Sequence, residues 1–429
     1  MLDWLNAFLQ HHQSLIGLVI FLIVFFDCIA LLGLAIPGNT MVVIASAVAG
    51  SYNYPLWKVI ILGILGGWLG DIVSYGIGYK LKKRVYQLSF VKKNPKWINS
   101  ADNYLKHYGI MGLVLGRFVS PLRSNMSMMV GIFHYPVVTF LIVTLMASSL
   151  WTITFVVPSW LTGVAFSFPV DEQFWMTLIY VVAILAIFIA ISIYGCLKQK
   201  RWVTAYMSLA SFVLLLLLYL FLPNLNTLDQ GVLAIVQTIQ EKPLEKVAHF
   251  ITELGGYKVQ FVISAVLCFL LLFMKQIKPL CFFAFTMLAT ATIGWILKES
   301  IARVRPFGMS DVVQTFSFPS GHTSASFAFF VSIGVLAGLG RPPKQRLMWL
   351  SIAFLPAFLI GLSRIYLNMH WLTDVIAGAL LAVGISMFVL TWVEFHKKMQ
   401  PLPMKCWKIL LPITLIVLIC GAVLSLRAL

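Results

Sequence analysis

The sequence predicts an all-α polytopic membrane protein, because few of its residues are charged and its apolar runs are long. Of its 429 residues, 60% are hydrophobic and only 10% are charged, whereas soluble domains carry roughly 25% charged residues. Apolar runs of about 20 residues recur along nearly the whole chain, and a helix of that length crosses a hydrocarbon layer of roughly 30 Å. The opening residues have no basic region and no small-residue cleavage site, so we expect the first span to be retained.

The predicted crossings fall into two groups, separated by the basic cluster Lys198, Lys200 and Arg201. We therefore expect a domain boundary near residue 200, with one membrane domain over 1–200 and a second over 201–429. The crossings before the boundary are expected near residues 14–35, 57–79, 136–158 and 173–196. Those after it are expected near residues 203–222, 257–274, 279–297, 320–340, 347–366, 374–394 and 407–426.

The basic residues indicate how the chain is oriented in the membrane. The net charge is +17, but Lys and Arg lie in short clusters between apolar runs, which argues against a nucleic-acid partner. Such clusters favour the cytoplasmic side; they are Lys80 to Lys96, Lys198 to Arg201, Lys275 with Lys278, Arg341 to Arg346, and Lys397 to Lys408. Two crossings separate each cluster after residue 200 from the next, so the loops 223–256, 298–319 and 366–373 are expected to face outward.

Two apolar stretches of the first half, 36–50 and 109–133, are interrupted. The interrupting residues are Pro37 and Gly38 in the first stretch, and Arg117, Pro121 and Arg123 in the second. Each stretch is compatible with a broken complete span or with a re-entrant segment. We favour two re-entrant segments, because they keep the first two basic clusters on one side of the membrane.

The outward loops of the second half hold the residue types that bind phosphate. Lys298, Arg305 and Arg364 offer positive charge and hydrogen-bond donors that suit phosphate oxygens. Ser320 and Gly321 begin an apolar helix, whose N-terminal backbone N–H groups can bind an anion. The spacing therefore predicts a phosphate site at the outer membrane face.

Two histidines are candidates for nucleophile and acid at this site. His370 lies four residues before Asp374, so on a helix the carboxylate can hold one ring nitrogen while the other attacks phosphorus. His322 can then protonate the departing oxygen. No carboxylate cluster for Mg²⁺ accompanies them, and the six cysteines lie singly. We therefore expect no metal, no cofactor and no disulfide framework.

These pieces resemble, position for position, the three-part signature of the type 2 phosphatidic acid phosphatase superfamily, which is related to vanadium haloperoxidases. The resemblance covers about 203–394 and implies a helical bundle with six core spans, which leaves 407–426 as an extra helix. It implies His370 as nucleophile, His322 as acid and Asp374 as orienting carboxylate. The phosphate-binding residues that it implies are Lys298, Arg305, Ser320, Gly321 and Arg364.

Residues 15–196 resemble the DedA family, also described as SNARE-associated or VTT-like, which is associated with polyprenyl-phosphate translocation and proton-coupled transport. The matching residues are Asp27, Pro37-Gly38, Gly70-Asp71, Tyr75, Gly78, Gly116 to Val119, Pro121, Arg123 and Gly131. The resemblance implies transport roles for Asp27, Arg117 and Arg123, and physical reasoning adds Asp71, because intramembrane arginines need an acid or a lipid phosphate. Asn39 stands where the family has a second acid. A purely structural ion pair is the alternative.

Together the two resemblances imply a bacterial inner-membrane lipid phosphatase, metal-independent and facing the periplasm or exterior, fused to a lipid-phosphate translocating module. The combination suggests undecaprenyl diphosphate as substrate. Phosphatidic acid, phosphatidylglycerol phosphate and lipid A are alternatives, as is a transporter whose phosphatase half only binds phosphate.

Outside the signature, we interpret Arg303 as a solvated or headgroup-facing charge and Asp311 as part of a loop. We interpret 226–256 as a connecting loop in preference to an interfacial lid.

Overall fold

The computed structural model describes residues 15–85, 111–167, 172–198, 202–306, 315–395 and 398–427, apart from residues 31, 36 and 119. These residues form helices and no strand. Ten of the described helices are long and apolar enough to cross a membrane, and each crossing expected from 57–79 onward coincides with one of them. The expected all-α polytopic class is confirmed.

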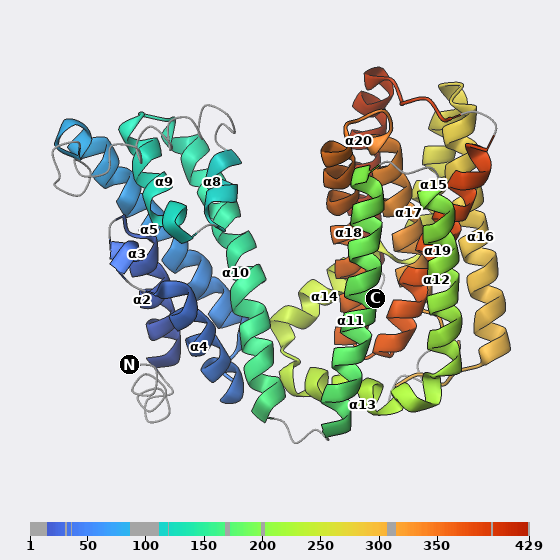
Figure 1. Ribbon diagram of the computed structural model, residues 1–429, viewed down its shortest axis with the longest axis horizontal. Helices are drawn as coiled ribbons and strands as arrows, with labels where there is room; N and C mark the ends of the chain where they lie inside the picture. The colour runs from blue at the N-terminus through green and yellow to red at the C-terminus, as the bar shows by residue number, and fades with distance from the viewer. Residues whose placement is uncertain are drawn as a thin grey trace. The chain divides into compact units, whose positions relative to one another are not determined.

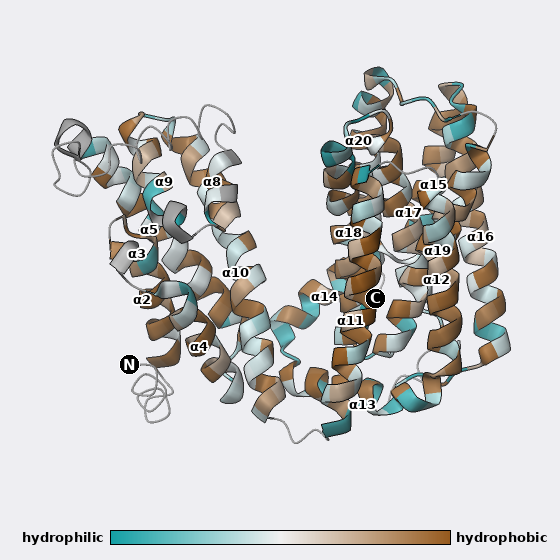
Figure 2. Cartoon of the chain, viewed as in Figure 1, coloured by the Kyte–Doolittle hydropathy of each residue, from teal (hydrophilic) through white to brown (hydrophobic). Residues whose placement is uncertain are grey.

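The chain divides into two compact units, Met1–Pro169 and Val170–Leu429. This division falls before the domain boundary expected near residue 200, which stays a prediction. The reason is the helix α11 (Glu172–Lys198), which packs against three helices of the second unit rather than completing the first. These three helices are α12 (Val203–Leu220), α13 (Asn226–Ile239) and α18 (Pro343–Tyr366). Figure 2 shows hydrophobic residues along the long helices of both units.

The described part of the first unit combines two long helices with five short ones (Figure 1). The long helices are α5 (Leu56–Val85) and α10 (Val137–Ser167). The short helices are α2 (Ile16–Cys28), α3 (Leu32–Ala35), α4 (Gly38–Ser51), α8 (Met111–Gly116) and α9 (Ser120–Ile132).

The crossing expected over 14–35 is wrong, because α2 ends after 13 residues at Cys28. At about 1.5 Å per residue, α2 spans roughly 20 Å and falls short of the hydrocarbon thickness. Ser74 of α5 stabilises the break: its hydroxyl donates to the carbonyl of Cys28 at 2.9 Å and accepts from the N–H of Ala30 at 2.8 Å. Two backbone groups at the break, the carbonyl of Cys28 and the N–H of Ala30, are therefore satisfied inside the protein.

The two interrupted stretches are broken helices, as the sequence indicates. The first breaks between α3 and α4 at Pro37, and the second between α8 and α9 at Arg117 and Phe118. Helices α8 and α9 lie side by side (Figure 1), a geometry compatible with the re-entrant interpretation, which stays a prediction. Glycines let the helices pack closely: a Cβ on Gly131 of α9 would collide with the backbone carbonyl of Tyr75 on α5.

The second unit is a bundle in which α17 is the most buried of the ten candidate spans. Helix α17 contacts α15, α16, α18 and α19. Besides α11, α12, α13 and α18, the unit contains the 3-10 helix η2 (Leu222–Leu225) and the helices α14 (Lys242–Leu254), α15 (Tyr257–Phe273), α16 (Ile277–Ile301), α17 (Gly321–Gly338), α19 (Leu372–Val393) and α20 (Met404–Arg427).

The segment 226–256, interpreted above as a loop, is instead the helix pair α13 and α14. Hydrophilic residues lie on these two short helices beside the more apolar spans (Figure 2). Their junction is fixed to the end of α18, because the N–H of Glu241 donates to the Tyr366 hydroxyl at 2.9 Å. Sequence patterning missed the helices because their apolar runs are short and their buried faces contact several other helices.

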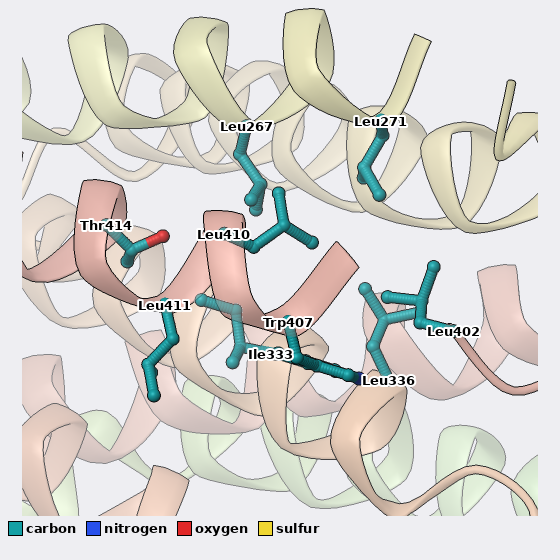
Figure 3. A pocket seen from close by; sticks show the side chains of 9 residues that line it. All are labelled: Leu267, Leu271, Ile333, Leu336, Leu402, Trp407, Leu410, Leu411 and Thr414. Carbon is teal, nitrogen blue, oxygen red and sulfur yellow. The ribbon is translucent and has the colours of Figure 1, made fainter. Parts of the chain in front are cut away.

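The additional helix α20 packs against α14 and α15. Figure 3 shows a small apolar cavity between α20, α15 and α17, with Trp407 across it. All but one of its lining side chains are hydrophobic, the exception being Thr414. Helix α20 thus extends the apolar core of the second unit.

Candidate active site

The three sequence pieces of the predicted phosphate site meet at one end of the second unit. Lys298 lies in the last turn of α16 and Arg364 in the last turn of α18. His370 lies in the short link between α18 and α19. The backbone N–H of Ser320 donates to the backbone carbonyl of Asp374 at 3.0 Å, which joins the start of α17 to the start of α19.

His370 is held between a carboxylate and a guanidinium group. Its Nδ1 lies 3.4 Å from Asp374 Oδ2, and its Nε2 lies 3.2 Å from Arg305 Nη1. Arginine is only a donor, so Nε2 must be the unprotonated acceptor, which leaves the ring proton on Nδ1 facing Asp374. Burial and then Arg364, Arg305 and Lys298 hold the pKa of His370 well below its usual range. The ring therefore carries its lone pair on Nε2 at neutral pH.

The three basic residues around His370 donate hydrogen bonds to uncharged groups. Lys298 Nζ donates to the carbonyl of Phe316 at 2.9 Å. Arg305 donates to the carbonyls of Thr315 and Met369 at 2.8 and 2.7 Å. Arg364 Nη1 donates to the hydroxyl of Thr252, on α14, at 3.0 Å. Their positive charge is therefore oriented but available for an anion.

The start of α17 adds an open surface beside these cations. Ser320 is buried and accepts a hydrogen bond from the Thr323 hydroxyl at 2.9 Å. Gly321 is exposed, and a Cβ added there would meet nothing within 4 Å. His322 follows in the first turn of the helix. The helix N-terminus thus offers space and backbone donors where a phosphate oxygen can bind.

The structure contradicts the interpretation of Arg303 as a solvated charge. Its guanidinium lies between two carboxylates, 2.7 Å from Asp374 Oδ1 and 2.6 Å from Asp229 Oδ2. Both carboxylates are essentially inaccessible to solvent. Sequence reasoning missed Asp229 because it lies on α13, 74 residues before Arg303. A lone acid in an apolar segment is the only signal that the sequence offers for it. Asp311 lies outside the described residues.

Among its described residues, the first unit contains two buried ion pairs, made by the residues selected there from the sequence. Arg117 pairs with Asp71, and Arg123 pairs with Asp27. Arg123 also donates to the side-chain oxygen of Asn39 at 2.8 Å. Asn39 therefore contributes an uncharged oxygen where the family has an acid.

Further contacts fix the first unit's arginine pair. Ser127 donates to Asp71 at 2.8 Å. The guanidinium groups of Arg117 and Arg123 lie 5.9 and 4.9 Å from the centre of the Trp151 ring. The four charges of the two ion pairs form a balanced cluster within this unit. Pro121 belongs to α9, but its side chain lies outside the described residues.

Models of two protein families match the chain. The PAP2 superfamily matches residues 279–400, which include all eight signature residues, and the VTT domain matches residues 36–161. The chain is thus a multi-pass membrane protein with a phosphatase domain. More particularly, it belongs to the DedA, or VTT-domain, family in its first part. Residues 279–400 match the model of the PAP2 superfamily and form a domain of that kind.

Individual relatives each match part of the chain. The inner membrane protein YabI of Escherichia coli is 30% identical over 173 residues, which cover 39% of this chain and 68% of YabI. An undecaprenyl-diphosphatase of Sulfolobus acidocaldarius is 31% identical over 140 residues, covering 31% of this chain and 64% of that protein. Phosphatidylglycerophosphatase B of Bacillus subtilis is 38% identical over 98 residues, covering 22% of this chain and 47% of that protein.

Among solved structures, the chain is similar to a transmembrane PAP2-type phosphatidylglycerolphosphate phosphatase from Bacillus subtilis. The sequences are 26% identical, the match covers 46% of this chain and 100% of that one, and the TM-score is 0.41.

Proposed function

We propose that the second unit hydrolyses a lipid-linked phosphate or diphosphate through a phosphohistidine on His370. The observation that carries this proposal is the orientation of the imidazole, whose Nε2 faces the donor Arg305 and whose Nδ1 faces Asp374. These partners favour the tautomer with no proton on Nε2. A nucleophilic histidine requires this tautomer, because the lone pair that attacks phosphorus must not carry hydrogen. The phosphate would replace the ring as a partner of Arg305.

The reaction proceeds in two balanced steps. His370 Nε2 forms a bond to phosphorus as the bond to the lipid oxygen breaks, and that oxygen takes a proton from His322. Water then attacks the phosphohistidine, gives a proton back to His322 and releases inorganic phosphate. Lys298, Arg305 and Arg364, together with Ser320 and Gly321, bind the phosphoryl oxygens and stabilise the charge that develops on them. Asp374 stabilises the positive charge of the phosphorylated ring.

The substrate that we favour is undecaprenyl diphosphate, with the lipid monophosphate as product. The fusion to a DedA-family unit supports this choice, as does the similarity to an undecaprenyl-diphosphatase. Phosphatidic acid, phosphatidylglycerol phosphate and lipid A are the alternatives, and the similarity to phosphatidylglycerophosphatase B favours the second of these.

The test is phosphate release from these four lipids in detergent, comparing the wild type with His370→Ala. We expect one lipid to be hydrolysed at least tenfold faster than the others, and the variant to be inactive. Equal rates of release by the two proteins would exclude the phosphohistidine on His370. No release from any of the four lipids by the wild type would leave a unit that only binds phosphate. Repeating the assay in EDTA tests metal independence, because a metal-independent enzyme keeps its rate.

We also propose that the site faces the periplasm or exterior of a bacterial inner membrane. The loops expected to face outward meet at the site, since Arg303 and Asp229 both contact the start of α19. The basic residues Arg341 to Arg346 lie at the other end of α17 and support a cytoplasmic position there. A cysteine at Asp311 should react with an external reagent and one at Gln345 should not; the reverse pattern would place the chemistry in the cytosol.

For the first unit, we propose transport of a lipid phosphate, with Arg117 and Arg123 exchanging their carboxylate partners for the headgroup. Asp27 and Asp71 would hold these cations between transport cycles. Arg123→Ala should reduce lipid uptake in vesicles while leaving detergent phosphatase activity intact. Unchanged uptake would support a purely structural ion pair instead.

A further inference from the structure

We propose that Asp229 and Arg303 are positioning residues that orient Asp374 and keep the carboxylate cluster beside His370 at one net negative charge. Both lie outside the eight signature residues. The inference rests on the proposed function, because it assigns them a role in forming the phosphohistidine.

Arg303 forms a bridge between two carboxylates that come from different helices. Its Nη1 contacts Asp374 on α19, and its Nη2 contacts Asp229 on α13. The Arg303 side chain is 17% exposed, whereas both carboxylate side chains are fully covered. The guanidinium also lies against the Trp371 ring, 5.4 Å from its centre. The fork of the guanidinium therefore has one fixed orientation, and Asp374 Oδ1 is held by it.

Asp229 also binds the first turn of α19 directly. Its Oδ1 accepts the backbone N–H of Thr373 at 3.0 Å, and its Oδ2 accepts the Thr373 hydroxyl at 2.6 Å. The first N–H groups of a helix have no partner within the helix, and a carboxylate is favourable at that end. Helix α13 therefore fixes the backbone immediately before Asp374, which in turn leaves Asp374 Oδ2 directed at His370.

The charges of the cluster explain why two acids are present. Arg303 alone would neutralise Asp374 and weaken its attraction for a positively charged ring. With Asp229 included, two carboxylates and one guanidinium leave a net charge of −1 beside His370. That charge is what the phosphorylated imidazole needs, because attack through Nε2 makes the ring a cation while Nδ1 keeps its proton.

A purely structural role predicts something different. If Asp229 only joined α13 to α19, its replacement by the isosteric amide would lower stability and disturb phosphate binding and phosphorylation together. If Asp229 sets the charge of the cluster, its replacement slows phosphorylation of His370. Phosphate binding stays as in the wild type, because Asp229 does not contact the cations of the phosphate site. A second neutral substitution at Arg303 should then restore the net charge of −1 and part of the rate.

The experiment measures phosphorylation of the full-length protein in one turnover. The probe is ³²P-labelled phosphatidic acid or undecaprenyl diphosphate labelled on its terminal phosphate, whichever the wild type hydrolyses faster, with labelled enzyme trapped in alkali. Inhibition by inorganic phosphate reports binding, and a thermal melt reports folding. The variants are Asp229→Asn and the double variant Asp229→Asn/Arg303→Gln. The matched control is Glu245→Gln, at an exposed acid on α14.

We expect His370 of the Asp229→Asn variant to become phosphorylated at least tenfold more slowly than in the wild type. The inhibition constant of inorganic phosphate should stay within threefold of the wild-type value. The double variant should be at least fivefold faster than Asp229→Asn, and the control unchanged. The proposal is overturned if Asp229→Asn stays within threefold of wild type, if phosphate inhibition falls in parallel with the rate, or if the double variant is no faster.

A second comparison decides the matter if Asp229→Asn fails to accumulate in the membrane. Arg303→Lys keeps the cluster at −1 with both carboxylates ionised, whereas in Arg303→Gln the two facing carboxylates share a proton, so Asp374 loses its fixed orientation and part of its charge. The Arg303→Lys variant should become phosphorylated at least tenfold faster than the Arg303→Gln variant, and equal rates would overturn the proposal. A wild-type protein that takes up no label at His370 would refute the proposed function itself. A labelled wild type whose variants are labelled equally fast would refute only the role of Asp229 and Arg303.

Discussion

Replacing Asp374 by asparagine tests how much the carboxylate contributes to His370 chemistry. Two unit charges separated by the observed 3.4 Å interact by about 5 kcal/mol at an effective dielectric constant of about 20. Arg303 offsets part of the carboxylate charge, and the amide retains a dipole, so we expect a loss of about 3 kcal/mol. At about 1.4 kcal/mol per decade, phosphorylation should slow on the order of 10²-fold.

The substitution leaves the local helix start in place, which makes the measurement interpretable. Asp374 accepts the backbone N–H of Trp371 at 3.0 Å, and the asparagine oxygen can accept the same bond. The assay is the single-turnover labelling of His370, with inhibition by inorganic phosphate as the binding control. A labelling rate within threefold of wild type would refute the assignment of Asp374 as the residue that stabilises the phosphorylated ring.

Three further predictions concern pH, phosphate binding and packing. Burial and then Arg364 lower the pKa of His370 well below its usual value near 6.5. We therefore expect a plot of kcat/KM against pH to show no acid-side fall with a midpoint near pH 6.5. A fall with that midpoint would contradict the buried neutral ring. Thr252→Val removes the hydroxyl that orients Arg364, so inhibition by inorganic phosphate should weaken about tenfold, and unchanged inhibition would exclude this role. Gly163→Val introduces a side chain on α10 against the backbone of α4, so we expect a lower melting temperature. An unchanged melting temperature would show that α10 and α4 can move apart at no cost.

The sequence predicts the long spans well because each is a continuous apolar run whose length matches a bilayer. The span over 14–35 is the exception, and its composition explains the error. The run stays apolar through the break after Cys28, so a hydropathy pattern cannot detect it. The break depends on the Ser74 hydroxyl, which comes from another helix and bonds both freed backbone groups. Such a contact is a property of the tertiary structure alone.

The same distinction applies to the candidate site. Lys298, Arg305 and the His370 to Asp374 spacing are readable because their chemistry is expressed in short segments. Arg303 belongs to one of these segments, yet its partner Asp229 lies far away in the chain and outside the part that matches the PAP2 model. Local spacing therefore identifies the residues that are proposed to bind phosphate, and misses the distant partner of the Arg303 guanidinium that contacts Asp374.

The basic residues at this end of the second unit differ in how their charge is balanced, and the difference has a chemical consequence. Arg303 is neutralised by two carboxylates. Among the described residues, Lys298, Arg305 and Arg364 form no ion pair of that kind and donate to uncharged groups. A protein that needed cations only for structure would pair all four, since an unpaired buried charge is costly. Three cations without a carboxylate partner suit the proposed binding of an anion with several oxygens. The net negative charge of the Arg303 cluster lies beside His370, where we propose that it stabilises the phosphorylated ring.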